Sequence, residues 1–112
     1  MDKIQSLTGM LDLYDDGDSN DLSKNIFETE KRIKKIFSNY FLKEIRTPAL
    51  EDTDLFKRSS GDASDIVNKE SYSFNDRNDK SISLRPEGSA SVIRAIIQKK
   101  QEHEKHKLWY QG

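Results

Sequence analysis

SISLRPEGSASVIRA, residues 81–95, begins with the pattern of a strand and ends with that of a helix. In its first part Ile82 and Leu84 alternate with serines, which is the period of a half-buried strand. Its last part and the two residues after it have apolar residues at helical spacing, namely Val92, Ile93, Ile96 and Ile97. Residues 85–89, Arg-Pro-Glu-Gly-Ser, lie between the two patterns, so the stretch predicts a strand joined to a helix by a short charged loop.

This loop has the composition of a small ligand site. The first amides of a helix lack partners and carry partial positive charge, which keeps a carboxylate such as that of Glu87 ionised and able to bind an ammonium group. Pro86 restricts the backbone, Gly88 leaves room for a ligand beside the main chain, and Ser89 offers a hydroxyl. On spacing alone a simpler interpretation is favoured, in which Glu87 and Ser89 cap the helix and Arg85 forms a surface ion pair.

Composition sets broad limits. The chain has 112 residues, 33% hydrophobic and 35% charged, with a net charge of −1 and no cysteine. These values predict one domain or part of one, with a modest core and no overall field that draws it to nucleic acid or membrane. Neither a signal peptide nor a membrane span is predicted, so we expect an intracellular protein.

The remaining pattern predicts an α+β fold on a largely antiparallel sheet. The expected elements are a helix over Asp21–Phe41, a strand over Glu44–Leu50 that contains Pro48, a helix over Asp52–Ser60, a hairpin of Ser71–Phe74 against Ser81–Leu84 with Asn78 able to take a left-handed conformation, a helix from Ser89 into the Gln98–Glu104 charge run, and a strand over Lys107–Gln111. The last strand has the apolar content of a central strand, which favours a fragment of a longer sheet.

Three pieces together make the chain recognisable. They are LRPEG at residues 84–88, the block from Asp65-Ile66-Val67 to Phe74, and LWYQG at residues 108–112. With EIRTPALEDTDLFKRSSGD before them, they closely resemble the N-terminal part of the histidyl-tRNA synthetase family, over about residues 22–112. The resemblance implies a class II aminoacyl-tRNA synthetase fold, an antiparallel sheet flanked by helices.

The resemblance also implies roles for particular residues. Glu87, Gly88 and Ser89 would contact histidine, with Glu87 facing its α-ammonium group. The helix over Asp21–Phe41 and the strand with Pro48 would build a homodimer interface. LWYQG opens the second class II motif, whose ATP-binding arginine would lie beyond the chain, so no ATP-binding residue is assigned.

The implied reaction is the ATP-dependent activation of L-histidine to histidyl-adenylate, followed by transfer to tRNA-His. ATP would act as its Mg²⁺ complex, with no protein-bound metal and no membrane partner, in the cytoplasm. Residues 1–112 would be an N-terminal fragment of the catalytic domain, without the anticodon-binding domain. Since the phosphate-binding arginines of the family are expected outside it, the fragment alone is predicted to be inactive although its parent is an enzyme.

The chain departs from the family pattern in three places. The arm at residues 8–15, TGMLDLYD, lacks the usual arginine and proline, so no function is assigned to it. Phe41 stands where a small glycine is usual at the corner between helix and strand. Ser89 replaces the usual threonine but keeps the hydroxyl.

The sequence leaves other functions open. One is the non-catalytic, synthetase-like regulatory subunit of ATP phosphoribosyltransferase in histidine biosynthesis, although Glu87-Gly88-Ser89 favours the synthetase. Another is a pure dimerisation or folding unit. A metal site at His103 and His106 is disfavoured because a structural zinc site needs four ligands. A basic patch for tRNA would use Lys99, Lys100, Lys105 and Lys107, but Glu102 and Glu104 dilute it.

Overall fold

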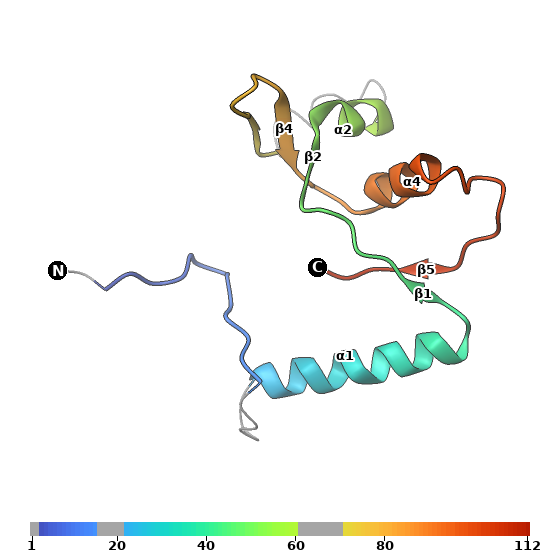
Figure 1. Cartoon of the computed structure of the whole chain (residues 1–112). Helices are drawn as coiled ribbons and strands as arrows, with labels where there is room; N and C mark the ends of the chain where they lie inside the picture. The colour runs from blue at the N-terminus through green and yellow to red at the C-terminus, as the bar shows by residue number, and fades with distance from the viewer. Residues whose placement is uncertain (1–2, 16–21, 61–70) are drawn as a thin grey trace. The chain divides into compact units, whose positions relative to one another are not determined.

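The structure is a computed structural model that describes residues 3–15, 22–60 and 71–112. It divides into two compact units, residues 1–42 and residues 43–112. The first unit contains an extended arm and helix α1 (Leu22–Asn39), and the described residues of the second form two short sheets and two helices, α2 and α4 (Figure 1). Within the described ranges, no helix is both long and apolar enough to cross a membrane.

Helix α1 confirms the helix predicted over Asp21–Phe41, with its last helical residue two positions earlier. Its amphipathic spacing places apolar residues on one face and lysines on the other. The arm before it meets α1 through the backbone N–H of Tyr14, which donates to Oγ of Ser23 at 3.1 Å. Residues 16–21, directly before this helix, lie outside the described residues.

The chain leaves α1 through a Schellman turn. The N–H of Phe41 donates to the carbonyl of Ser38 at 3.0 Å, and the N–H of Leu42 donates to the carbonyl of Phe37 at 2.9 Å. Such a turn needs one left-handed residue, and Phe41 supplies it with φ of 62°. Glycine is usual there because a Cβ in this conformation costs about 1–2 kcal/mol. This chain therefore departs from the family pattern, with Phe41 in place of glycine, at a position where the backbone conformation favours glycine.

The smaller sheet of the second unit has two parallel strands, β1 (Lys43–Glu44) and β5 (Leu108–Trp109). The strand predicted over Lys107–Gln111 is confirmed, but only across two residues. Within the described part of the chain its one neighbour is β1, so β5 is an edge strand there and not the central strand that its apolar content indicated.

The strand predicted over Glu44–Leu50 is wrong as a single element. Its beginning belongs to β1, and its end begins β2 (Leu50–Asp52), which pairs in the other sheet. Pro48 lies between the two strands, because proline has no N–H to offer to a ladder. A residue that follows β4 binds this connection between β1 and β2. The N–H of Arg85 donates to the carbonyl of Ala49 at 2.9 Å.

The larger sheet is antiparallel, in the order β2-β4-β3. The predicted hairpin is confirmed, with β4 (Ser81–Leu84) as expected and β3 (Ser73–Asn75) shifted along the chain from the predicted Ser71–Phe74. Its turn does contain a left-handed residue, but that residue is Asp79, with φ of 61°, and not Asn78.

The polar face of this sheet is the buried one. Ser83 of β4 is completely buried, and its Oγ lies 2.9 Å from Oγ1 of Thr53. Glu51 of β2 pairs with Ser83 across the ladder and is also buried. The alternate residues of the strands point to the opposite face. Three large apolar side chains on that face are about half exposed, namely Leu50, Phe74 and Leu84.

Helices α2 (Thr53–Ser60) and α4 (Ser89–Gln98) lie side by side in the second unit (Figure 1). Phe56 of α2 and Ala90 of α4 are the buried hydrophobic residues among those described, with Leu55 packed against them. The helix predicted over Asp52–Ser60 is thus confirmed, and its core contact is with the helix that follows the charged loop.

Helix α4 confirms the helix predicted from Ser89, and it ends at Gln98, the first residue of the charge run. The chain turns there as it does after α1. The N–H of Lys100 donates to the carbonyl of Ile97 at 2.9 Å, and Lys100 has φ of 57°. A left-handed residue stops a helix whatever the helix propensity of the residues beyond it.

Candidate functional site

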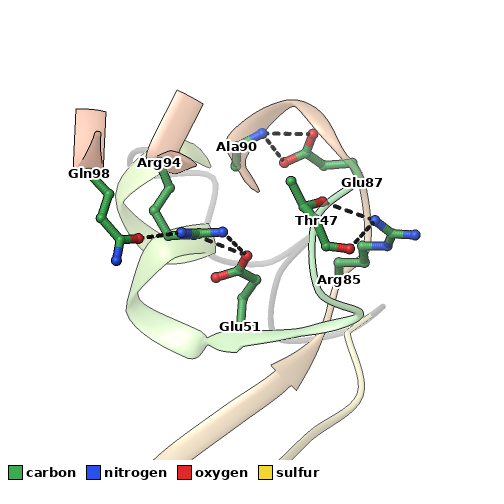
Figure 2. Close-up of polar contacts among 7 residues, drawn as sticks. All are labelled: Thr47, Glu51, Arg85, Glu87, Ala90, Arg94 and Gln98. Atoms are coloured by element: carbon green, nitrogen blue, oxygen red, sulfur yellow. Dashed lines mark hydrogen bonds and ion pairs between the residues drawn. The ribbon is translucent and has the colours of Figure 1, made fainter. Parts of the chain in front are cut away.

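Glu87 caps helix α4 with its side chain. Its Oε2 accepts a hydrogen bond from the N–H of Ser89 at 2.6 Å, and its Oε1 accepts one from the N–H of Ala90 at 3.1 Å. Figure 2 shows the carboxylate turned back toward Ala90 at the start of the helix. Two of the amides that a helix leaves without partners are therefore satisfied, and the capping interpretation is confirmed for Glu87.

The cap leaves Glu87 able to bind a second donor. An ionised carboxylate has about four acceptor positions, and the amides of Ser89 and Ala90 use only part of them. Glu87 and Ser89 are both exposed, so their oxygen atoms remain accessible. The site thus presents a fixed, accessible anion with a hydroxyl group two residues away, which suits an ammonium group with a neighbouring polar atom.

Gly88 is buried under the ring of Tyr110. A Cβ added to Gly88 would lie 2.3 Å from Cε2 of Tyr110 and 2.4 Å from its Cζ. The space that the missing side chain leaves is therefore filled by this ring in the structure. The contact brings together LRPEG and LWYQG, two of the sequence pieces that carry the resemblance.

Arg85 does not form the surface ion pair that the sequence allowed. Its Nη1 donates to Oγ1 of Thr47 at 3.1 Å and to the carbonyl of Thr47 at 3.4 Å. Figure 2 shows the guanidinium group turned toward Thr47, which lies in the connection between β1 and β2. On the other side, its Nη2 lies close to Gly112, where a Cβ would be 3.1 Å away.

Arg94 of α4 makes the one ion pair in the described residues that has a buried carboxylate. Its Nη2 lies 2.9 Å from Oε1 of Glu51, and its Nε donates to the same oxygen at 3.1 Å. Its Nη1 also donates to Oε1 of Gln98 at 2.7 Å. Thr47, Glu51 and Arg94 were not identified as site residues from the sequence. A single arginine inside the apolar run SASVIRAII was the available signal.

A groove of about 870 Å³ runs between α2 and α4. Leu55, Ile93 and Ile97 provide much of its apolar wall. Glu87 and Ser89 line the groove where α4 begins, so two of the three predicted site residues face one depression, whereas Gly88 is not among its lining residues. Arg58 of α2 lines it as well.

The two histidines of the disfavoured metal site follow helix α4. His103 and His106 lie beyond the end of α4, and Nε2 of His106 contacts the carbonyl of Gln101 at 2.7 Å. The described residues contain no group of three His, Cys, Asp or Glu side chains placed to hold a metal ion. The block Asp65-Ile66-Val67 lies outside the described residues.

Comparison with known proteins gives consistent results. The sequence model of the family described as histidyl-tRNA synthetase matches residues 19–112. The chain is 52% identical over 87 residues to a histidine–tRNA ligase of Latilactobacillus sakei, covering 74% of this chain and 20% of that protein. It is 46% identical over 113 residues to a histidine–tRNA ligase of Synechococcus, covering 100% of this chain and 26% of that protein.

The structure gives the same result. It matches a crystal structure of apo Staphylococcus aureus histidyl-tRNA synthetase with a TM-score of 0.69 and 34% sequence identity, covering 96% of this chain and 24% of that one. The chain therefore spans a fifth to about a quarter of the length of these three relatives.

Proposed function

Because the chain belongs to the histidyl-tRNA synthetase family, we propose that residues 1–112 are the N-terminal part of the catalytic domain of a histidine–tRNA ligase. Its fold is α+β, an antiparallel sheet flanked by helices, and it represents part of a class II synthetase, as the sequence predicted. The proposed partners are L-histidine, ATP and tRNA-His, with a second copy of the chain as homodimer partner and the cytoplasm as location.

The proposed reaction has two steps. A carboxylate oxygen of histidine attacks the α-phosphorus of ATP, forming histidyl-adenylate and releasing pyrophosphate. A ribose hydroxyl at the end of tRNA-His then attacks the activated carbonyl carbon and releases AMP. ATP carries Mg²⁺, which neutralises phosphate charge. The described residues contain no cluster suited to holding that ion, so no step is assigned to a metal ligand of this chain.

Within this reaction Glu87 binds the α-ammonium group of histidine. The observation that carries the proposal is the Glu87 carboxylate itself, which is exposed yet fixed by the amides of Ser89 and Ala90. A fixed anion determines where the ammonium group sits, and hence where the histidine carboxylate points. The hydroxyl of Ser89 and the main chain at Gly88 complete the proposed contacts with histidine.

A chimaeric enzyme tests the proposal. Residues 1–112 replace the matching quarter of the Synechococcus histidine–tRNA ligase, and histidine-dependent pyrophosphate exchange is measured. Glu87→Gln keeps the shape of the side chain and removes its charge. A charge-assisted hydrogen bond contributes about 1.5–3 kcal/mol, so we expect KM for histidine to rise about tenfold to a hundredfold.

Glu102→Gln, the same change in the charge run beyond α4, is the matched control and should leave KM unchanged. An inactive wild-type chimaera would count against the proposed function. If the chimaera is active and Glu87→Gln leaves both KM and kcat unaltered, the role of Glu87 is wrong.

A further inference from the structure

Two arginines flank the Glu87 loop, and both reach the same short segment of chain. Arg85 comes two residues before Glu87 and contacts Thr47. Arg94 comes seven residues after Glu87 and contacts Glu51. Thr47 and Glu51 lie on either side of the start of β2, so residues 47–51 hold the loop and its helix at both ends (Figure 2).

The contact between Glu51 and Arg94 is the stronger of the two anchors. Both Nε and Nη2 of Arg94 approach Oε1 of Glu51, and the Glu51 side chain is only 7% exposed. Removing one partner of a buried pair leaves the other charge without compensation, so the pair strongly resists separation. Gln98 fixes the other edge of the same guanidinium group.

The contact between Arg85 and Thr47 fixes the other end. Here the guanidinium group binds a hydroxyl and a carbonyl, and the backbone N–H of Arg85 also donates to the carbonyl of Ala49. The side chain and the main chain of Arg85 therefore both bind the segment between β1 and β2. The loop cannot slide along β2 without breaking both kinds of contact.

Glu87 must follow the helix that these anchors fix. Its carboxylate is bound to the first amides of α4, so any rotation or shift of α4 moves the carboxylate as well. Arg94 lies five residues after Ser89, which is about 7.5 Å along the helix axis. An anchor at that distance controls both the rotation and the tilt of the helix start.

We propose that Thr47 and Glu51 are positioning residues for the amino-acid site, acting through Arg85 and Arg94 to place the Glu87 carboxylate against histidine. This inference rests on the proposed function, because it assigns the same site a second layer of residues that does not touch the substrate. Displacement of a binding group by about 1 Å can cost about a hundredfold in rate, so a loosened anchor should be measurable.

The first experiment uses the chimaera with Glu51→Gln and, as a milder variant, Thr47→Val. Glu102→Gln is again the matched control, because Glu102 is exposed in the charge run beyond α4. We expect Glu51→Gln to raise KM for histidine about tenfold and Thr47→Val about threefold, while KM for ATP stays within about twofold, since only amino-acid placement is lost.

A purely structural role would give a different pattern. Loss of folded enzyme lowers kcat in proportion to the folded fraction and leaves KM unchanged. A lower kcat with an unchanged KM for histidine in Thr47→Val would overturn the proposal. An equal rise of KM for histidine and KM for ATP in either variant would overturn it as well. So would an unchanged KM for histidine in Glu51→Gln.

The second experiment does not depend on activity. In the 112-residue chain, Glu51→Gln should speed amide hydrogen exchange at Ser89 and Ala90 about tenfold, because opening of α4 exposes the capped amides. Glu102→Gln should leave their exchange unchanged. If the wild-type chimaera is inactive, the proposed function fails, and unchanged protection of these amides would refute the anchor as well. Faster exchange with an unchanged KM for histidine in an active chimaera would reduce the anchor to a structural contact.

Discussion

Gly88→Ala should destabilise the second unit because of one side chain, Tyr110. The backbone at Gly88 has φ of −104°, a conformation that alanine adopts without strain. The new Cβ would nevertheless lie 2.3, 2.4 and 2.7 Å from three atoms of the Tyr110 ring. Carbon atoms in contact are about 3.5–4.0 Å apart, so the ring must retreat by about 1.2 Å or more.

The size of the effect follows from this geometry. Forcing an extra methyl group into a packed contact costs about 1–3 kcal/mol. In the absence of the ring, alanine should be neutral or stabilising by about 0.4–1 kcal/mol, because it reduces the freedom of the unfolded chain. We therefore expect Gly88→Ala to change from destabilising to neutral or stabilising in the Tyr110→Ala background.

The assay is urea unfolding of the 112-residue chain and three variants: the two single substitutions and the double one. Trp109 is the single tryptophan of the chain and lies next to Tyr110, so its fluorescence reports on this region. A coupling free energy of about 1–3 kcal/mol is expected from the cycle. An equal loss of stability for Gly88→Ala in both backgrounds would refute the reasoning, because the cost would then not arise from the ring.

Three further predictions concern stability and activity. Phe41→Gly and Lys100→Gly should each raise the free energy of unfolding by about 1 kcal/mol, because glycine relieves a left-handed backbone; a loss of stability in both would contradict this. The pKa of Asp52 is lowered from its usual 3.8, first by the hydrogen bond from the Asp54 amide and then by Lys80, so its contribution is present above pH 3.8 and is lost as pH falls through the folded-state pKa. The difference in unfolding free energy between wild type and Asp52→Asn should thus be constant near neutral pH and shrink in acid; a difference that grows in acid would show the opposite sign. The 112-residue chain alone should give no pyrophosphate exchange above a blank, and exchange that persists through repurification and disappears with Glu87→Ala would contradict that.

The periodicity of the sequence was sufficient for the helices and the hairpin. It did not reveal how strand residues divide between sheets, because a two-residue strand and a three-residue strand on either side of Pro48 have the same alternation as one longer strand. Alternation also does not show which face is covered. Ser83 is buried and Leu84 is half exposed, since α2 packs against β2 and β4 and its Thr53 contacts Ser83.

The site was predictable only where its residues are adjacent in sequence. Glu87, Gly88 and Ser89 occupy one turn of chain, so the junction of strand and helix indicated them as candidates. Spacing alone favoured a helix cap, and their proposed contacts with histidine came from the family resemblance. Thr47 is 38 residues from Arg85, and Glu51 is 43 residues from Arg94. No local pattern encodes a contact over such separations, which depends on the pairing of β2 with β4.

Capping and ligand binding by Glu87 are compatible, although the cap affects affinity in two opposite ways. The N-terminal end of a helix carries about half a positive charge. This charge offsets part of the attraction of the Glu87 carboxylate for an ammonium group. Against this, a free glutamate side chain loses about 1.5–2 kcal/mol of rotamer entropy when a ligand immobilises it. The hydrogen bonds from the amides of Ser89 and Ala90 have already fixed the side chain, which removes much of that loss.

These two effects oppose each other, so the clearest benefit of the cap is the fixed position of the Glu87 carboxylate. The ammonium group is then bound at one place relative to α4. Adenylate formation depends on such placement, because the histidine carboxylate must meet the α-phosphorus in line with the leaving pyrophosphate.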